Sequence, residues 1–102
     1  MADPNDVNKR FARSLDFYLV QDFASAIEDL NQAIIIEGNF FPVYFNRALI
    51  RYKQLEYQKM EKEYDLKANP GEKSAVKAAD YEMVKRDLDK VIELAPDFAM
   101  LI

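Results

Sequence analysis

The stretch that decides the fold occurs twice: residues 22–39 read DFASAIEDLNQAIIIEGN, and residues 80–97 read DYEMVKRDLDKVIELAPD. In each copy an aromatic residue is followed by apolar residues 3, 7, 10 and 13 positions later, which is the spacing of one helix face. These positions are Phe23, Ala26, Leu30, Ala33 and Ile36 in the first copy, and Tyr81, Val84, Leu88, Val91 and Leu94 in the second. A helical unit that recurs in so short a chain predicts a repeat architecture, and such architectures typically bind other proteins.

Composition limits the kinds of function that the chain can have. It has 102 residues, enough for one domain, and its formal charge of −4 leaves no basic surplus for nucleic acid. Because cysteine and histidine are both absent, no thiolate nucleophile, imidazole base or Cys/His zinc site can form. The acids in the pairs Glu28/Asp29 and Asp87/Asp89 do not share a helix face, so neither pair predicts an acid–base or metal site. We therefore expect no catalytic residues, no cofactor and no bound metal.

Four helices are expected from the apolar spacing and the helix breakers. The first begins near Asp6 or Val7, and the second covers residues 23–37 after a turn and cap at Gln21-Asp22. The pair Gly38-Asn39 predicts a left-handed residue that ends the second helix.

The third helix opens near Pro42 and should continue beyond Leu55 for three further turns, because the next breakers are at residues 69–71. The fourth helix begins at Asn69 or Ser74, either of which can cap it. It ends at about residue 95, since the following residue is a proline. No stretch of the chain predicts a strand.

Both copies of the repeated stretch resemble the second helix of a tetratricopeptide repeat. The segment Tyr44-Phe45-Asn46-Arg47-Ala48 is similar to the family's aromatic-x-Asn-Arg-small stretch, in which the small residue lets two helices approach closely. Ser14 holds that small position in the first unit, and Gln21 lies where the family usually has glycine. The resemblance implies an all-α domain over residues 1–102, with two antiparallel helix-turn-helix pairs at about 7–39 and 41–98.

One departure from the family predicts an elongated second pair. Phe23 and Tyr81 lie 58 residues apart, which exceeds the family's period of about 34 by 24. The excess falls at about 58–80, and Gln54-Leu55 takes the place of the usual turn. We therefore expect a second hairpin whose tip projects beyond the repeat body. Its balanced charges fit a partner contact, but they favour a solvated pair of helices.

In this family the first helix of each pair lines a concave groove that receives extended peptides or partner helices. The resemblance implies a partner-binding groove lined by Phe11, Leu15, Tyr18, Phe45, Asn46, Leu49, Tyr52 and Lys53. The alternative is that Leu15, Leu49 and part of the aromatic set only pack between helices. Asn46 also matches one asparagine of the clamp with which some members grip chaperone tails. Because Phe11 and Leu15 replace its companions, we do not expect such a clamp.

The C-terminal residues predict self-association. Phe98, Met100, Leu101 and Ile102 belong to an apolar tail that a monomer would expose to water. The last helix also lacks the polar capping element of most solenoids. We expect a homodimer in which the tail docks on another copy, or else a fragment of a longer repeat array.

The function expected from these features is non-catalytic binding of a protein or peptide partner. The alternatives are a structural segment that mediates homo-oligomerisation and a regulatory piece of a larger protein. No apolar run approaches the roughly 20 residues that span a bilayer, so membrane insertion is not expected. Bacterial proteins of this kind work in the cytoplasm or the periplasm, and the sequence favours neither.

Overall fold

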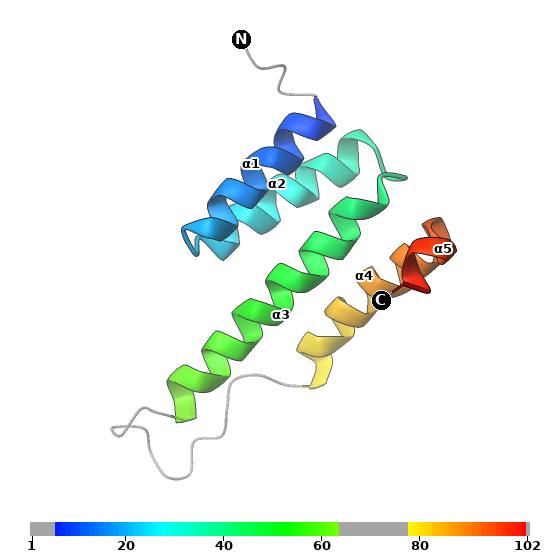
Figure 1. Cartoon of the computed structure of the whole chain (residues 1–102). Coiled ribbons are helices and arrows are strands. Elements are labelled where there is room, and N and C mark those ends of the chain that lie inside the picture. Colours follow the sequence, from blue (N-terminus) through cyan, green and yellow to red (C-terminus); the bar gives the residue numbers. More distant parts are fainter. Residues whose placement is uncertain (1–5, 64–77, 102) are drawn as a thin grey trace.

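The computed structural model describes residues 6–63 and 78–101. This part of the chain forms helices and no strand, as the apolar spacing predicts (Figure 1). The helices are α1 (Val7–Leu19), α2 (Phe23–Ile36), α3 (Phe41–Glu63), α4 (Ala78–Leu94) and α5 (Pro96–Ala99). The expected turn at residues 69–71, the expected caps Asn69 and Ser74, and the tail residue Ile102 lie outside the described residues.

The helices pack in chain order. α1 packs against α2, α3 packs against α4, and α2 also packs against α3. Figure 1 shows α1 and α2 on one side of α3 and α4 on its other side, with neighbouring helices of each pair running in opposite directions. The short helix α5 lies against the end of α4. α3 is therefore shared by both halves of the molecule.

Capping side chains place the starts of α1 and α2 where the sequence predicts them. Asp6 accepts hydrogen bonds from the backbone nitrogens of Asn8 (3.0 Å) and Lys9 (3.3 Å). Asp22 accepts one from the backbone nitrogen of Ser25 (3.2 Å). These carboxylates satisfy N–H groups that have no carbonyl partner in the first turn of a helix.

Two predictions for the longer helices agree with the structure, namely the continuation of α3 past Leu55 and the end of α4. α3 continues past Leu55 and is helical to Glu63, the last residue before the undescribed stretch. α4 ends at Leu94, and Ala95 leaves the helical region (φ −144°, ψ 69°) directly before Pro96. A residue that precedes proline is sterically excluded from the α region, so this helix end follows from the sequence.

One predicted turn conformation is wrong. Neither Gly38 nor Asn39 has a positive φ, and the chain leaves α2 through Glu37 in an extended conformation (φ −147°, ψ 94°). The left-handed residue is Gln21 (φ 62°), which lies between α1 and α2. Only a residue without Cβ adopts this region without steric cost, so the turn between α1 and α2 is the position that favours glycine.

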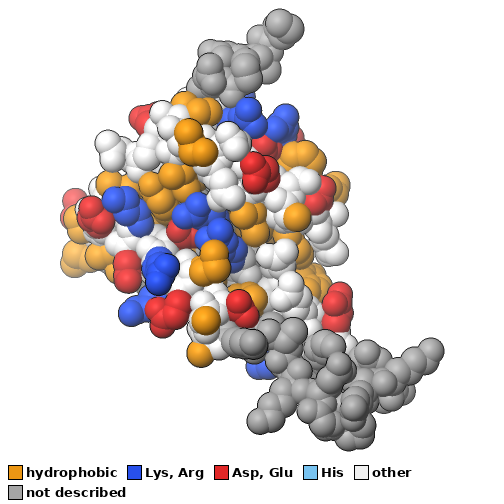
Figure 2. Space-filling view, turned by 180° about the vertical axis from the view of Figure 1, so that it is seen from behind, with side chains coloured by type: hydrophobic (Ala, Val, Ile, Leu, Met, Phe, Trp, Pro, Cys, Tyr) orange, Lys and Arg blue, Asp and Glu red, His pale blue; other side chains and the backbone are white. Residues whose placement is uncertain are grey.

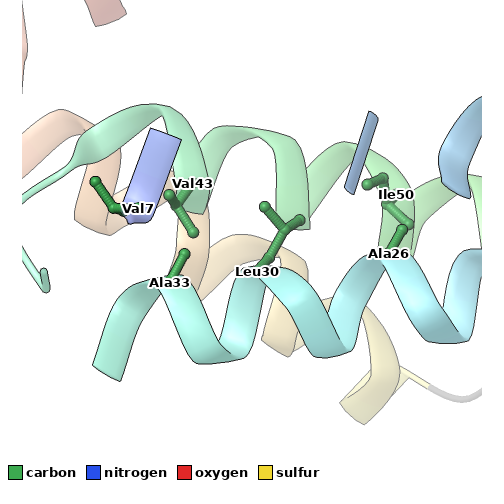
Figure 3. Close-up of a cluster of buried hydrophobic side chains, with 6 residues drawn as sticks. All are labelled: Val7, Ala26, Leu30, Ala33, Val43 and Ile50. Carbon is green, nitrogen blue, oxygen red and sulfur yellow. The ribbon is translucent and has the colours of Figure 1, made fainter. Parts of the chain in front are cut away.

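The main core lies where three helices meet. It consists of Val7 from α1, of Ala26, Leu30 and Ala33 from α2, and of Val43 and Ile50 from α3. Figure 3 shows the α2 and α3 residues of this core facing each other. A smaller cluster joins α3 and α4 through Ala48, Leu55 and Val84. The small residues Ser14 and Ala48 are both fully buried. Ala26, Leu30 and Ala33 of the stripe predicted from the first copy are therefore buried in the core, whereas Ile36 is 37% exposed.

The two helical pairs are related position by position. α3 begins 34 residues after α1, and α4 ends 58 residues after α2. An aromatic contact recurs at the same offsets: the rings of Phe11 and Phe40 are 5.7 Å apart, and those of Phe45 and Phe98 are 5.4 Å apart. This aromatic contact therefore occupies an equivalent place in the two pairs.

The outer side of α1 differs from the matching side of α3. The two α3 residues that pack on α2, Val43 and Ile50, lie 34 positions after Lys9 and Asp16 of α1. Both of these α1 residues are charged and exposed. The side of α1 that corresponds to a helix–helix contact is therefore polar.

Candidate functional site

A buried aspartate in each pair binds an arginine of the preceding helix. Arg13 of α1 donates from Nε to Oδ2 of Asp29 (2.7 Å), and from Nη2 to Oδ1. Arg47 of α3 makes the same two hydrogen bonds with Asp87. Its Nε donates to Oδ2 at 2.9 Å, and its Nη2 donates to Oδ1 at 2.6 Å. These pairs join the two helices of each hairpin, since a guanidinium fork matches the two carboxylate oxygens.

Sequence reasoning missed these ion pairs, although a signal for them exists. Asp29 and Asp87 each lie six residues after the aromatic that begins the repeated stretch, and Arg13 and Arg47 each precede the buried small residue. Each acid therefore links the two helices of its hairpin through an ion pair. A search for matched polar positions, in addition to matched apolar ones, would have found both pairs.

A second arginine contacts each aspartate. Arg10 lies 3.3 Å from Asp29 and Arg51 lies 3.4 Å from Asp87, measured from Nη1 to the carboxylate oxygen. The hydrogen bond from Arg13 lowers the pKa of Asp29 below its usual value, and burial opposes this effect. Burial, followed by the charge of Arg47, lowers the pKa of Arg51, whereas Asp87 opposes that shift.

The residues expected to line the groove form two matching stripes. α1 carries Phe11, Leu15 and Tyr18, and the residues 34 positions later on α3 are Phe45, Leu49 and Tyr52. The residue types are identical at all three positions. Leu15 is 38% exposed and Leu49 is 45% exposed, so the two leucines are open to solvent to a similar degree, whereas both phenylalanines are half-buried.

One end of this surface is hollowed. Tyr18 and Leu19 at the end of α1 and Lys53 and Tyr57 on α3 line a depression of about 190 Å³, together with Gln21 and Phe23. The ring of Tyr57 stacks on Phe23 at 5.7 Å. Two of the expected groove residues, Tyr18 and Lys53, thus meet in one depression, while the expected groove residue Asn46 is half-buried on α3.

Several of the expected residues contact aromatic rings within the chain, among them Phe11 and Tyr18. Phe98, expected to mediate self-association, is half-buried, and its ring lies 5.0 Å from Phe41 and 5.4 Å from the groove residue Phe45. The ring of Tyr52 lies 6.3 Å from that of Tyr81 on α4. Phe98 therefore helps to attach α5 to α3.

The end of the molecule formed by α4 and α5 is apolar and open. Leu88, Val91, Ile92 and Ala99 line a depression of about 190 Å³ there. Leu88 is 37% exposed and Ile92 is 54% exposed, and beyond them Met100 and Leu101 are each 85% exposed. The expected self-association residues Met100 and Leu101 are thus available to solvent.

Comparison with known proteins does not add to this picture. No protein-family model, no curated protein and no solved structure matches the chain. In the part of the chain that is described, no helix is both long enough and apolar enough to cross a membrane.

Proposed function

We propose that this chain is a non-catalytic protein–protein interaction module, a two-repeat solenoid of the tetratricopeptide type that binds a partner polypeptide in the groove between α1 and α3. The observation that carries the proposal is the recurrence of Phe, Leu and Tyr at matching positions of the two helices. The two leucines are exposed to similar extents.

Packing within the chain accounts for the phenylalanines and tyrosines in part, since their rings contact other aromatic rings, but it does not account for the two leucines. A leucine that is more than one third exposed contributes little to a core, so two matching exposed leucines suit a binding surface. The tyrosines beside them, Tyr18 and Tyr52, offer large rings with a polar end, which are common in protein interfaces. The hollow at Tyr18 and Lys53 gives this surface a depression in which a side chain of the partner can be anchored.

The structural details that support the family assignment are the close helix contacts and the turn. Ser14 and Ala48 are buried at equivalent positions, where a small side chain lets the helices of a pair approach. The left-handed Gln21 lies where the resembling family usually has glycine. Both features are consistent with a tetratricopeptide hairpin.

The test is a comparison of groove and non-groove variants with a selected ligand. A peptide is first selected from a random display library on the purified chain. Its dissociation constant is then measured by calorimetry for wild type, for the double variant Leu15→Ser/Leu49→Ser, and for the control Ile35→Ser. Ile35 is an exposed aliphatic residue on α2, so the control removes similar surface elsewhere.

The groove variant should weaken binding by about tenfold or more, since interface anchors contribute about 1–2 kcal/mol each. The control should bind like wild type. Peptides whose affinity is unchanged in the groove variant, or reduced equally in the control, would contradict the proposal. Circular dichroism of all three proteins verifies that they are folded.

A second candidate function, homo-oligomerisation, is favoured by the open apolar end of α4 and α5. The depression formed by Leu88, Val91, Ile92 and Ala99 is the surface that another copy would cover. Light scattering over a concentration series tests this, with Ile92→Glu as the variant and Ile35→Glu as the matched control. Dimers of wild type and control, but not of Ile92→Glu, would support it, whereas monomers in all three would exclude it.

A further inference from the structure

A second surface lies on the side of α3 that faces away from the groove. Arg47, Arg51, Gln54 and Gln58 follow one another at helical spacing and line two adjoining hollows. A helix turns by about 100° per residue, so this stripe is displaced by about half a turn from the stripe of Phe45, Leu49 and Tyr52. Figure 2 views the molecule from behind and shows basic side chains near the middle of that face, with apolar side chains beside them.

The smaller hollow carries an excess of positive charge. Its volume is about 260 Å³, and Arg47, Arg51, Met83, Arg86 and Asp87 line it. Three arginines and one aspartate therefore line this hollow. A local positive charge of this kind contrasts with the net charge of −4 on the whole chain.

The carboxylate of Asp87 already accepts hydrogen bonds from two arginines. Arg47 uses both oxygens of Asp87, and Arg51 reaches only one of them, at 3.4 Å. Arg86 is exposed and has no hydrogen bond or ion pair with any described residue. Arg51 and Arg86 thus retain N–H groups that can donate to a ligand.

The larger hollow adjoins the first and is lined by apolar and polar residues in equal number. It has a volume of about 540 Å³ and shares Arg51 and Met83 with the basic hollow. Its other lining residues come from α2, α3 and α4, and they are Ala24, Ile27, Gln54, Leu55, Gln58 and Asp80. Because Asp80 is acidic, this hollow suits an aliphatic side chain better than a second carboxylate.

We propose that this face binds an acidic polypeptide segment, with a Glu or Asp carboxylate held by Arg51 and Arg86 and a neighbouring aliphatic side chain in the hollow formed by Ile27, Leu55 and Met83. The planar guanidinium groups match a carboxylate in geometry and charge. The apolar residues of the adjoining hollow are the reason for choosing a polypeptide over a free inorganic anion. This site lies opposite the proposed groove, so it does not depend on that function.

The test uses defined probes and arginine side-chain resonances. The full chain is titrated with acetyl-Ala-Leu-Glu-Ala-amide, with the corresponding Gln peptide, and with sodium phosphate. The Nε–Hε signals of Arg51 and Arg86 and the methyl signal of Met83 are followed by NMR. The Glu peptide should shift all three signals saturably, and the Gln peptide should bind about tenfold more weakly, as expected for loss of a charge-assisted hydrogen bond.

Two variants with the same change in charge separate this site from general attraction. Arg86→Gln should weaken binding of the Glu peptide by about tenfold. The control is Lys9→Gln, since Lys9 is an exposed cation on α1. It should change the affinity by about twofold at most, because distant charges are screened. The proposal is overturned by equal binding of the two peptides or by equal losses in the two variants. Phosphate that binds as tightly as the Glu peptide would also overturn it, by showing a small-anion site. Unchanged NMR signals of Leu15 and Leu49 would show that the Glu peptide does not bind in the groove.

Discussion

The two helical pairs share a sequence pattern but differ in what covers them. Leu30 of α2 is fully buried, whereas Leu88, at the matching position of α4, is 37% exposed. Each of these helices packs against the first helix of its own pair. α2 is covered in addition by the long helix α3, whereas the further element packed on α4 among the described residues is the four-residue helix α5. The pattern thus determines which face of a helix is apolar, and the next element in space determines whether that face is buried.

The arginine–aspartate pairs differ in the same way. Asp29 and Asp87 are both buried, but the side chain of Arg13 is 57% exposed and that of Arg47 is 18% exposed. Arg47 also donates to Asn31 of α2 (2.9 Å), so it links both pairs. The same ion pair therefore lies at the surface in the first pair and inside the molecule in the second.

The largest difference between the pairs should appear when the aspartates are replaced. Asp87→Asn leaves Arg47 and Arg51 enclosed without a counter-charge, so it should lower the free energy of unfolding by about 3 kcal/mol or more. Asp29→Asn leaves the more exposed Arg13 free to hydrate and should cost about 1–2 kcal/mol. Urea denaturation of both variants measures the difference. Equal losses would show that arginine exposure does not control the effect.

Shortening the matching leucines should give the next largest difference. Leu30→Ala creates a cavity in the core and should cost about 3 kcal/mol, whereas Leu88→Ala at a partly exposed site should cost about 1 kcal/mol. Denaturation at low protein concentration provides the comparison. If the loss of unfolding free energy in Leu88→Ala increases with protein concentration and approaches the loss in Leu30→Ala, the face of α4 is covered by another copy.

The acid sensitivity of the chain should depend on Asp29. Its pKa is lowered in the folded state, so the ionised carboxylate adds stability above its unfolded pKa of about 3.9, and this stability is lost as the pH falls through the folded value. Between about pH 5 and pH 2, the free energy of unfolding should therefore fall more steeply for wild type than for Asp29→Asn. Urea titrations at several pH values give the two slopes. An equal pH dependence of the unfolding free energy in the two proteins would contradict the lowered pKa of Asp29.

The smallest effects should come from the two turns. Gln21→Gly removes the strain of a left-handed non-glycine residue and should stabilise the chain by about 1 kcal/mol. Gly38→Ala should be neutral or stabilise it by about 0.5 kcal/mol, since an added Cβ would meet its nearest atom, the carbonyl oxygen of Ile34, at 3.6 Å. Thermal unfolding followed by circular dichroism measures both changes. A destabilised Gly38→Ala would indicate that Gly38 has a structural role after all.

The helices could be predicted from the sequence because their determinants are local. Apolar spacing, the caps Asp6 and Asp22, and Pro96 act within a few residues, and the structure agrees with each of them. The conformation at Gly38 was mispredicted because a glycine after a helix permits a left-handed turn without requiring one. Tyr44 binds the Gly38 carbonyl oxygen through its hydroxyl (2.7 Å), and a contact of this kind is not visible in the local pattern.

The candidate surfaces were only partly predictable because they depend on contacts between helices. The positions of Leu15 and Leu49 followed from the resemblance, but the packing of Phe98 on Phe41 did not. The basic hollow was missed because Arg51 and Arg86 come from different helices. Their proximity depends on the packing of α3 against α4, which the spacing along either helix does not contain.

The charged outer side of α1 limits the symmetry of any assembly of this chain. Lys9 and Asp16 occupy the positions that correspond to Val43 and Ile50, so α1 of one copy cannot cover α4 of another in the way that α3 covers α2. Repeated head-to-tail stacking, which would generate an open filament, is therefore disfavoured. Copies in which α4 and α5 meet the same elements of another copy would instead be related by a twofold axis, and such an assembly closes at two subunits.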